Sequence, residues 1–159
     1  MATTTAAITL TSADLLTDAL SLSATNTLYK AGTTVGLDQT TGMTKAYLTA
    51  TTVVDIFPPL IEDGDTASPA FTGKSSWVYI CNMSEDETEY ITVKISGNII
   101  GKLYAGDFLW MPWSQSKDGH GDNHHGDITV APSVATGMWL QWCMINEGTE
   151  YPTENLAVA

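Results

Sequence analysis

The 159-residue chain is long enough for one domain with an additional arm, and its 43% hydrophobic share, with five Trp, six Tyr and three Phe, predicts a folded core. Eighteen carboxylates against six basic residues give a formal net charge of −12, and all six bases are lysines. Because nucleic-acid binding needs clustered cations and favours arginine, this composition argues against DNA, RNA and anionic membranes as direct partners.

The N-terminal residues predict a short helix and no targeting segment. A cationic stretch followed by an apolar run is absent, and no window approaches the roughly 18 apolar residues of a membrane helix, so we expect a soluble protein without a secretion signal. Over residues 11–20, Ser12 is suited to a helix N-cap, and Leu15, Leu16 and Leu20 share one face at helical spacing.

Residues 22–42 are rich in Ser, Thr and Gly and contain only brief apolar islands, such as Leu28 with Tyr29. This composition suits an extended arm that lies on another surface better than it suits an independent core. We therefore divide the chain into an arm with the short helix over 1–44 and a β domain over 45–159.

The β domain is predicted from short strands separated by turn residues. Residues 45–57 are β-branched and aromatic, which indicates one strand or two strands joined by a kink. Residues 77–83 and 90–95 are expected to pair as a hairpin around a polar turn. Further strands are expected over 99–103, 108–113, 128–131 and 138–145. Strands at intervals of roughly 8–12 residues predict an all-β, antiparallel sandwich of jelly-roll type, centred on Ser76 to Asn146.

Tryptophans three apart along a strand point to opposite faces of the sheet. Of Trp139 and Trp142, and of Trp110 and Trp113, we expect at most one member to fill the core and the other to be exposed or buried at an interface. A flat aromatic sheet face covered by a partner is one interpretation, and a platform for stacking sugar rings is the alternative. The candidate interface residues are Leu15, Leu16, Leu28, Tyr29, Trp110, Trp113, Trp139 and Trp142.

Catalysis is not expected. No Gly-x-Ser-x-Gly motif is present, and the carboxylates of 62–65 and 85–87 fall in turns, where charged runs are usually solvated. Cys81 and Cys143 lie in apolar strand-like runs, as buried thiols or as one cross-strand disulfide, without a base in their own segments.

Several stretches resemble a pattern found in virion proteins of tailed bacteriophages. The run WVYICNMS at 77–84 matches an I-x-N-x-S strand, and GKLYAGDFLWMP at 101–112 contains the L-x-x-G-(D/E)-F turn. The run YKAGTTVGL at 29–37 is similar to the arm of capsid cement, or decoration, proteins.

This resemblance implies a non-enzymatic decoration protein on the capsid surface of the virion, where a homotrimer binds the major capsid protein and stabilises the head. Leu15, Leu16, Leu28 and Tyr29 would then anchor the arm. The alternative is a carbohydrate-binding module of a phage tail fibre or adhesin.

Three histidines gather in one glycine-rich loop, at His120, His124 and His125, together with three Asp. Imidazoles suit zinc, nickel or copper and oxygens suit calcium, but the spacing matches no metal-site template. A solvated loop, a metal site, and an oligomer-axis or capsid contact all stay open, and in a trimer His124 or His125 could meet around one ion. No other cofactor is expected.

Overall fold

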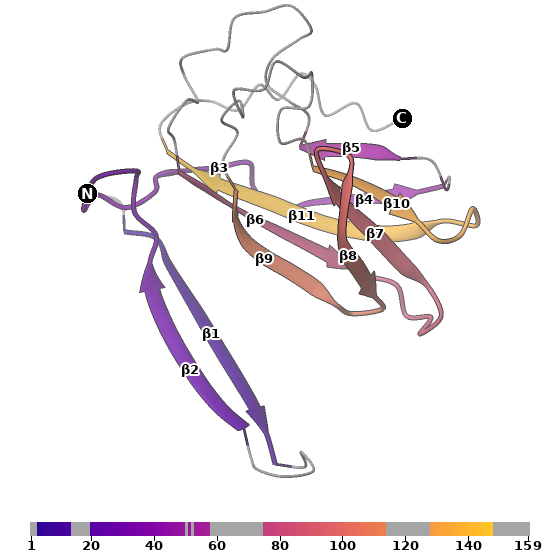
Figure 1. Cartoon of the computed structure of the whole chain (residues 1–159), viewed down its shortest axis with the longest axis horizontal. Coiled ribbons are helices and arrows are strands. Elements are labelled where there is room, and N and C mark those ends of the chain that lie inside the picture. The colour runs from indigo at the N-terminus through magenta and orange to yellow at the C-terminus, as the bar shows by residue number, and fades with distance from the viewer. Residues whose placement is uncertain are drawn as a thin grey trace, which may run out of the picture.

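The computed structural model describes residues 3–13, 20–49, 51, 53–57, 75–113 and 128–147. Within these ranges the chain is all-β, its sheets are antiparallel, and no helix occurs. Figure 1 shows a long two-stranded hairpin that projects from a body made of two sheets. The prediction of an all-β, antiparallel fold is therefore confirmed. Across these same ranges, no helix that could span a membrane is found.

The hairpin consists of β1 (Thr5–Ser12) and β2 (Leu20–Thr27). Their register runs from Thr5 opposite Thr27 to Ser12 opposite Leu20. The predicted helix is wrong at both ends, since Ser12 and Leu20 lie in strands. Eight consecutive cross-strand pairs between Thr-rich, alternating segments outweigh a helical period that covers only ten residues. Positions 14–19, which include Leu15 and Leu16, lie outside the described residues.

The larger sheet contains β3 (Gln39–Thr40), β4 (Thr44–Leu48), β6 (Ser76–Asn82), β9 (Phe108–Trp113) and β11 (Met138–Asn146). The long strand β11 pairs with β6 along one side, and with β4 and β3 in line along the other. The strand β9 pairs with β6 and lies at the edge of the sheet. Because β3 pairs with β11, the end of the predicted arm is part of this sheet.

The smaller sheet contains β5 (Val54–Phe57), β7 (Tyr90–Ile95), β8 (Asn98–Tyr104) and β10 (Ile128–Pro132), in the order β5-β10-β7-β8. A tight turn at Ser96-Gly97 joins β7 to β8, and both residues have positive φ, at 49° and 76°. Two-residue hairpin loops favour this conformation because its twist matches that of the strands.

Two predictions about strand pairing are decided by this arrangement. Residues 45–57 form two strands, and β4 and β5 belong to different sheets. The expected hairpin between 77–83 and 90–95 is wrong, because β6 pairs with β9 and β11 whereas β7 pairs with β8 and β10. Alternation determines which face of a strand is buried but not which strand it pairs with.

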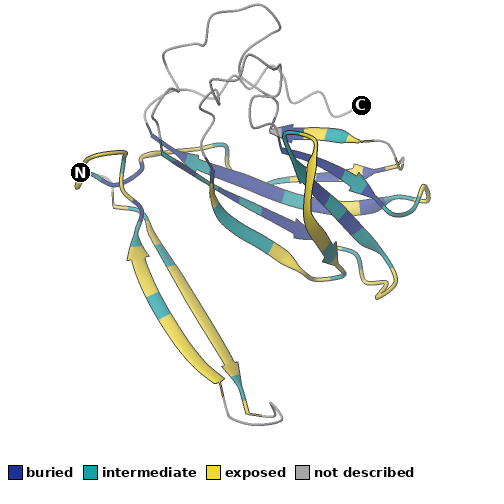
Figure 2. Cartoon of the chain, viewed as in Figure 1, coloured by how far each residue is buried: buried dark blue, intermediate teal, exposed yellow. Residues whose placement is uncertain are grey.

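One hydrophobic core lies between the two sheets, and Figure 2 shows that buried residues concentrate there while the hairpin is exposed. The larger sheet contributes Val78, Ile80, Trp113, Met138, Leu140, Trp142 and Met144, and the smaller sheet contributes Ile56, Ile91, Val93, Ile128 and Val130. Along β7 and β11, buried side chains largely alternate with more exposed ones. Cys81 and Cys143 are buried free thiols, which confirms the first of the two alternatives for them.

Candidate functional site

The hairpin has one apolar face and one face of small, mostly polar side chains. Register and alternation place Ala6, Ile8, Leu10, Leu20, Leu22 and Ala24 on the same side, which we call the apolar hairpin face. The opposite side carries Thr and Ser with one Ala, including the cross-strand pair Thr9 and Ser23. The four large side chains of the apolar hairpin face are exposed, with accessible fractions of 41% for Ile8, 46% for Leu10, 45% for Leu20 and 47% for Leu22.

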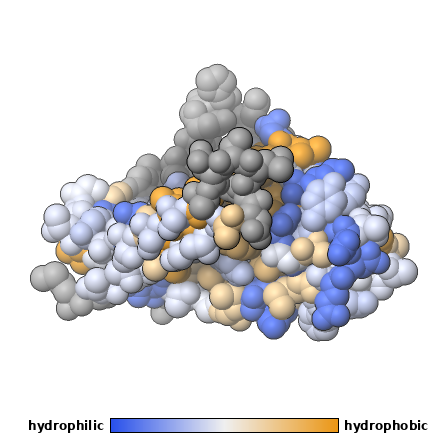
Figure 3. Space-filling view, turned by 90° about the horizontal axis from the view of Figure 1, so that it is seen from below, coloured by the Kyte–Doolittle hydropathy of each residue, from blue (hydrophilic) through white to orange (hydrophobic). Residues whose placement is uncertain are grey.

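A projecting two-stranded hairpin is marginally stable in water by itself, because it has no second layer to bury its apolar side. Full burial of a Leu or Ile side chain stabilises by roughly 1.5–3 kcal/mol, and about half of each side chain here is exposed. Neither β1 nor β2 contains a charged residue, although the chain carries a net charge of −12. In the left part of Figure 3 weakly polar and apolar residues predominate, whereas the most hydrophilic residues gather at the right. The apolar hairpin face is therefore suited to contact with another protein surface.

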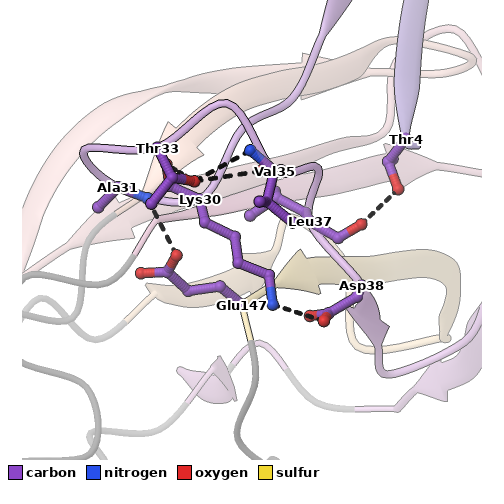
Figure 4. Close-up of polar contacts among 8 residues, drawn as sticks. All are labelled: Thr4, Lys30, Ala31, Thr33, Val35, Leu37, Asp38 and Glu147. Atoms are coloured by element: carbon purple, nitrogen blue, oxygen red, sulfur yellow. Dashed lines mark hydrogen bonds and ion pairs between the residues drawn. The ribbon is translucent and has the colours of Figure 1, made fainter. Parts of the chain in front are cut away.

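The base of the hairpin is held by backbone and side-chain hydrogen bonds (Figure 4). The hydroxyl of Thr4 donates to the carbonyl of Leu37 at 2.7 Å, and the N–H of Leu28 donates to the carbonyl of Thr4 at 2.9 Å. Leu28 and Leu37 are buried within this base, at 4% and 0% exposure. Of the two predicted anchors described here, Leu28 is thus used inside the chain, whereas Tyr29 is exposed.

A buried carboxylate connects this base to the larger sheet. Glu147, which directly follows β11 and is only 5% exposed, accepts hydrogen bonds from the backbone N–H of Ala31 at 2.9 Å and of Ser75 at 3.0 Å. Nearby, Lys30 and Asp38 form a surface ion pair at 2.5 Å, a type of contact that contributes little stability. Sequence reasoning missed Glu147. Its one available signal was an isolated acid immediately after a long apolar strand.

The outer face of the larger sheet is the second candidate surface. Six rings there alternate with core side chains and form what we call the aromatic face: Tyr47, Trp77, Tyr79, Phe108, Trp110 and Trp139. They associate in pairs, with ring centroids 5.3 Å apart for Trp77 and Trp110, 6.0 Å for Tyr79 and Phe108, and 5.1 Å for Tyr47 and Trp139. Phe108 and Trp139 are the most exposed rings, at 60% and 51%.

The environment of this face suppresses ionisation. Burial, followed by a hydrogen bond with Cys81 and by electrostatic repulsion from Cys81 and Cys143, raises the pKa of Tyr79 to about 12. Burial likewise raises the pKa of the Cys143 thiol. These groups are neutral at physiological pH, so the middle of the aromatic face is an apolar surface. The outer face of the smaller sheet differs, since it carries Lys94 and Lys102, and the Lys102 ammonium lies 3.8 Å from the centroid of the Tyr90 ring.

The expected offset between neighbouring tryptophans is confirmed. Trp142 and Trp113 are 3% and 6% exposed and belong to the core, whereas Trp139 and Trp110 lie on the aromatic face. Alternation along β9 and β11 is the reason, so Trp113 and Trp142 line the core instead of an external surface.

The predicted metal ligands His120, His124 and His125 lie outside the described residues. Among the residues that are described, no group of three or more His, Cys, Asp or Glu could hold a metal ion. Metal binding by the histidine loop therefore stays a prediction.

No protein-family model, no curated protein and no solved structure matches this chain. The candidate functional surfaces are accordingly those that the chain itself presents. They are the apolar hairpin face, which projects into solvent, and the aromatic face, whose most exposed rings are Phe108 and Trp139.

Proposed function

We propose that this chain is a non-enzymatic assembly protein that attaches to the outside of a protein shell and stabilises it, as capsid cement proteins of tailed phages do. The observation that carries the proposal is the hairpin, whose two strands carry no charged residue and hold four exposed Leu and Ile side chains away from the body. The resemblance of 77–84, 101–112 and 29–37 to phage virion proteins points in the same direction.

In this proposal the major capsid protein is the partner, a homotrimer is the bound form, and the capsid surface of the virion is the location. The β domain acts as a rigid platform of jelly-roll-like sandwich type, supported by its single core between two sheets. Glu147 and the buried Leu28 and Leu37 connect the hairpin firmly to that platform. A protein that binds the assembled shell better than free subunits stabilises the shell by mass action.

A matched pair of double variants tests the attachment. Leu10→Thr with Leu22→Thr removes a cross-strand apolar pair while keeping β-forming residues, and Thr9→Ala with Ser23→Ala alters the adjacent pair on the opposite face. In co-sedimentation with purified phage heads, we expect the first variant to lose at least tenfold in affinity and the control to bind like the wild type. Wild-type occupancy by the Leu10 and Leu22 variant would refute hairpin attachment.

The second candidate function is carbohydrate binding, and the aromatic face is the observation that favours it. Flat, exposed rings such as Phe108 and Trp139 can stack against sugar rings. Calorimetry against a panel of polysaccharides separates the two functions. Carbohydrate binding requires an affinity that Trp139→Ala abolishes, whereas the cement function predicts no glycan affinity.

A further inference from the structure

The chain presents two exposed apolar surfaces that cannot easily meet within one copy. The hairpin is rooted beside Glu147, which follows the C-terminal end of β11, whereas Trp139 lies at the beginning of that strand. Phe108 belongs to the same end as Trp139, because Phe108 and Gln141 both lie opposite Cys81. Nine residues of extended strand span about 30 Å, and the hairpin projects away from the body (Figure 1).

The strands of the hairpin and the aromatic face are both almost free of charged side chains. The strands of the hairpin carry no charged residue, and the outward positions of β4, β6, β9 and β11 carry no carboxylate and only one lysine, Lys45. Two copies with a net charge of −12 each repel one another, so a stable contact between them requires surfaces free of like charges. Both surfaces meet this requirement.

Their dimensions match as well. Eight residues per strand give the hairpin a length of about 27 Å, and two strands with their side chains are about 10 Å wide, so one footprint covers roughly 270 Å². The strands of the larger sheet, up to nine residues long, offer a platform of comparable length. If two copies exchange hairpins reciprocally, such a footprint is buried on both hairpin faces and on both aromatic faces. The total of roughly 1,100 Å² exceeds the roughly 1,000 Å² expected of a specific interface.

We propose that the apolar hairpin face of one copy packs on the aromatic face of a second copy, around Phe108 and Trp139, so that copies of the chain are joined by exchange of their hairpins. This inference rests on the proposed assembly function and adds a second copy of the chain to the major capsid protein as a partner of the hairpin. The contact is head-to-tail, because it joins two different surfaces, and it closes into a ring or a dimer according to the angle between copies.

Complementation between two variants tests the head-to-tail contact. Leu10→Thr with Leu22→Thr disables the hairpin and leaves the aromatic face intact, whereas Phe108→Thr with Trp139→Thr does the reverse. We expect wild-type protein to be oligomeric by light scattering and each variant alone to be monomeric. Their equimolar mixture should associate through one of the two contacts, more weakly than the wild type. Thr9→Ala with Ser23→Ala, and Thr92→Ala on the smaller sheet, serve as controls and should assemble like the wild type.

A wild-type monomer at about 100 µM, a concentration well above a micromolar Kd, would overturn the proposal. So would assembly of either variant alone at the strength of the wild type, since hairpins would then pair with hairpins or aromatic faces with aromatic faces. Crosslinking tests the same contact independently. A photo-crosslinker placed at Leu10, in a mixture of isotopically labelled and unlabelled chains, should form interchain crosslinks to β9 or β11. Crosslinks only to another hairpin would contradict exchange.

The same crosslinking on purified heads separates this inference from the proposed function. Crosslinks from Leu10 to the capsid protein, together with monomeric protein in solution, would keep the cement function and reject hairpin exchange. Assembly by exchange without any affinity for heads would keep the exchange and reject the cement function.

Discussion

Glu147 and Ala31 lie 116 positions apart in the chain, and the carboxylate of Glu147 accepts a hydrogen bond from the backbone N–H of Ala31 at 2.9 Å. The same carboxylate accepts from the N–H of Ser75 at 3.0 Å, so one buried side chain connects the root of the hairpin, the central strand β11 and the start of β6. This carboxylate therefore links the base of the hairpin to the larger sheet.

We expect Glu147→Ala to lower the free energy of unfolding by about 1–2 kcal/mol, because two backbone donors lose their acceptor in a partly buried setting. Hydrogen exchange at Ala31 and Ser75 should accelerate selectively. The control is Lys30→Gln, which breaks only the surface ion pair with Asp38 and should cost less than about 1 kcal/mol. Unchanged exchange at Ala31 in the Glu147 variant would show that the carboxylate does not hold the hairpin base.

Gly137→Ala should disturb one edge of the aromatic face. Gly137 has φ of +109°, and a Cβ atom there would collide with the ring and hydroxyl of Tyr47. The Tyr47 hydroxyl donates to the carbonyl of Thr136 at 3.1 Å, and its ring contacts Trp139. We expect a loss of about 1–2 kcal/mol from the backbone conformation alone, together with a changed tryptophan fluorescence spectrum.

Gly101→Ala is the matched control for that substitution, because no atom lies within 4 Å of the added Cβ and Gly101 lacks a positive φ. Its stability should change by less than about 0.5 kcal/mol. Equal effects of the two substitutions would mean that the contact between Tyr47 and Gly137 has no structural role.

Tyr79 should ionise at a higher pH than an ordinary tyrosine does. Its pKa is raised to about 12, chiefly by burial, so the folded state holds the phenolic proton more tightly than the unfolded state does. The resulting stabilisation is fully present below about pH 10 and is lost as the pH rises toward 12. Ultraviolet difference titration should show a late step that Tyr79→Phe removes. A single tyrosine transition near the ordinary value in the folded wild type would contradict this.

The Cys143 thiol should react slowly in the folded protein. Burial raises its pKa, which lowers the fraction of thiolate, and the thiolate is the reactive form. Alkylation by iodoacetamide at pH 8, followed by mass spectrometry, should be at least tenfold slower in native than in urea-unfolded protein. Equal rates in the two states would show that the centre of the aromatic face is open to water.

Alternating side chains and turn residues predict most strand positions and the opposite faces of each strand. Alternation of side chains has a period of two, so the spacing of three places Trp139 and Trp142 on opposite faces, and the structure shows that Trp142 is the buried one. The same alternation predicted the strand over 90–95, whereas the burial of Cys81 and Cys143 was predicted from the apolar runs in which they lie.

Strand pairing could not be predicted in this way and is known from the three-dimensional structure, because alternation is satisfied equally by any partner with a complementary face. The structure therefore separated β6 from β7, and it turned the segment around Ser12 and Leu20 from a predicted helix into paired strands. Glu147 belongs to the same class of feature. Its role depends on two backbone donors that are distant in sequence and that come within reach only when the hairpin base and β6 have docked on β11.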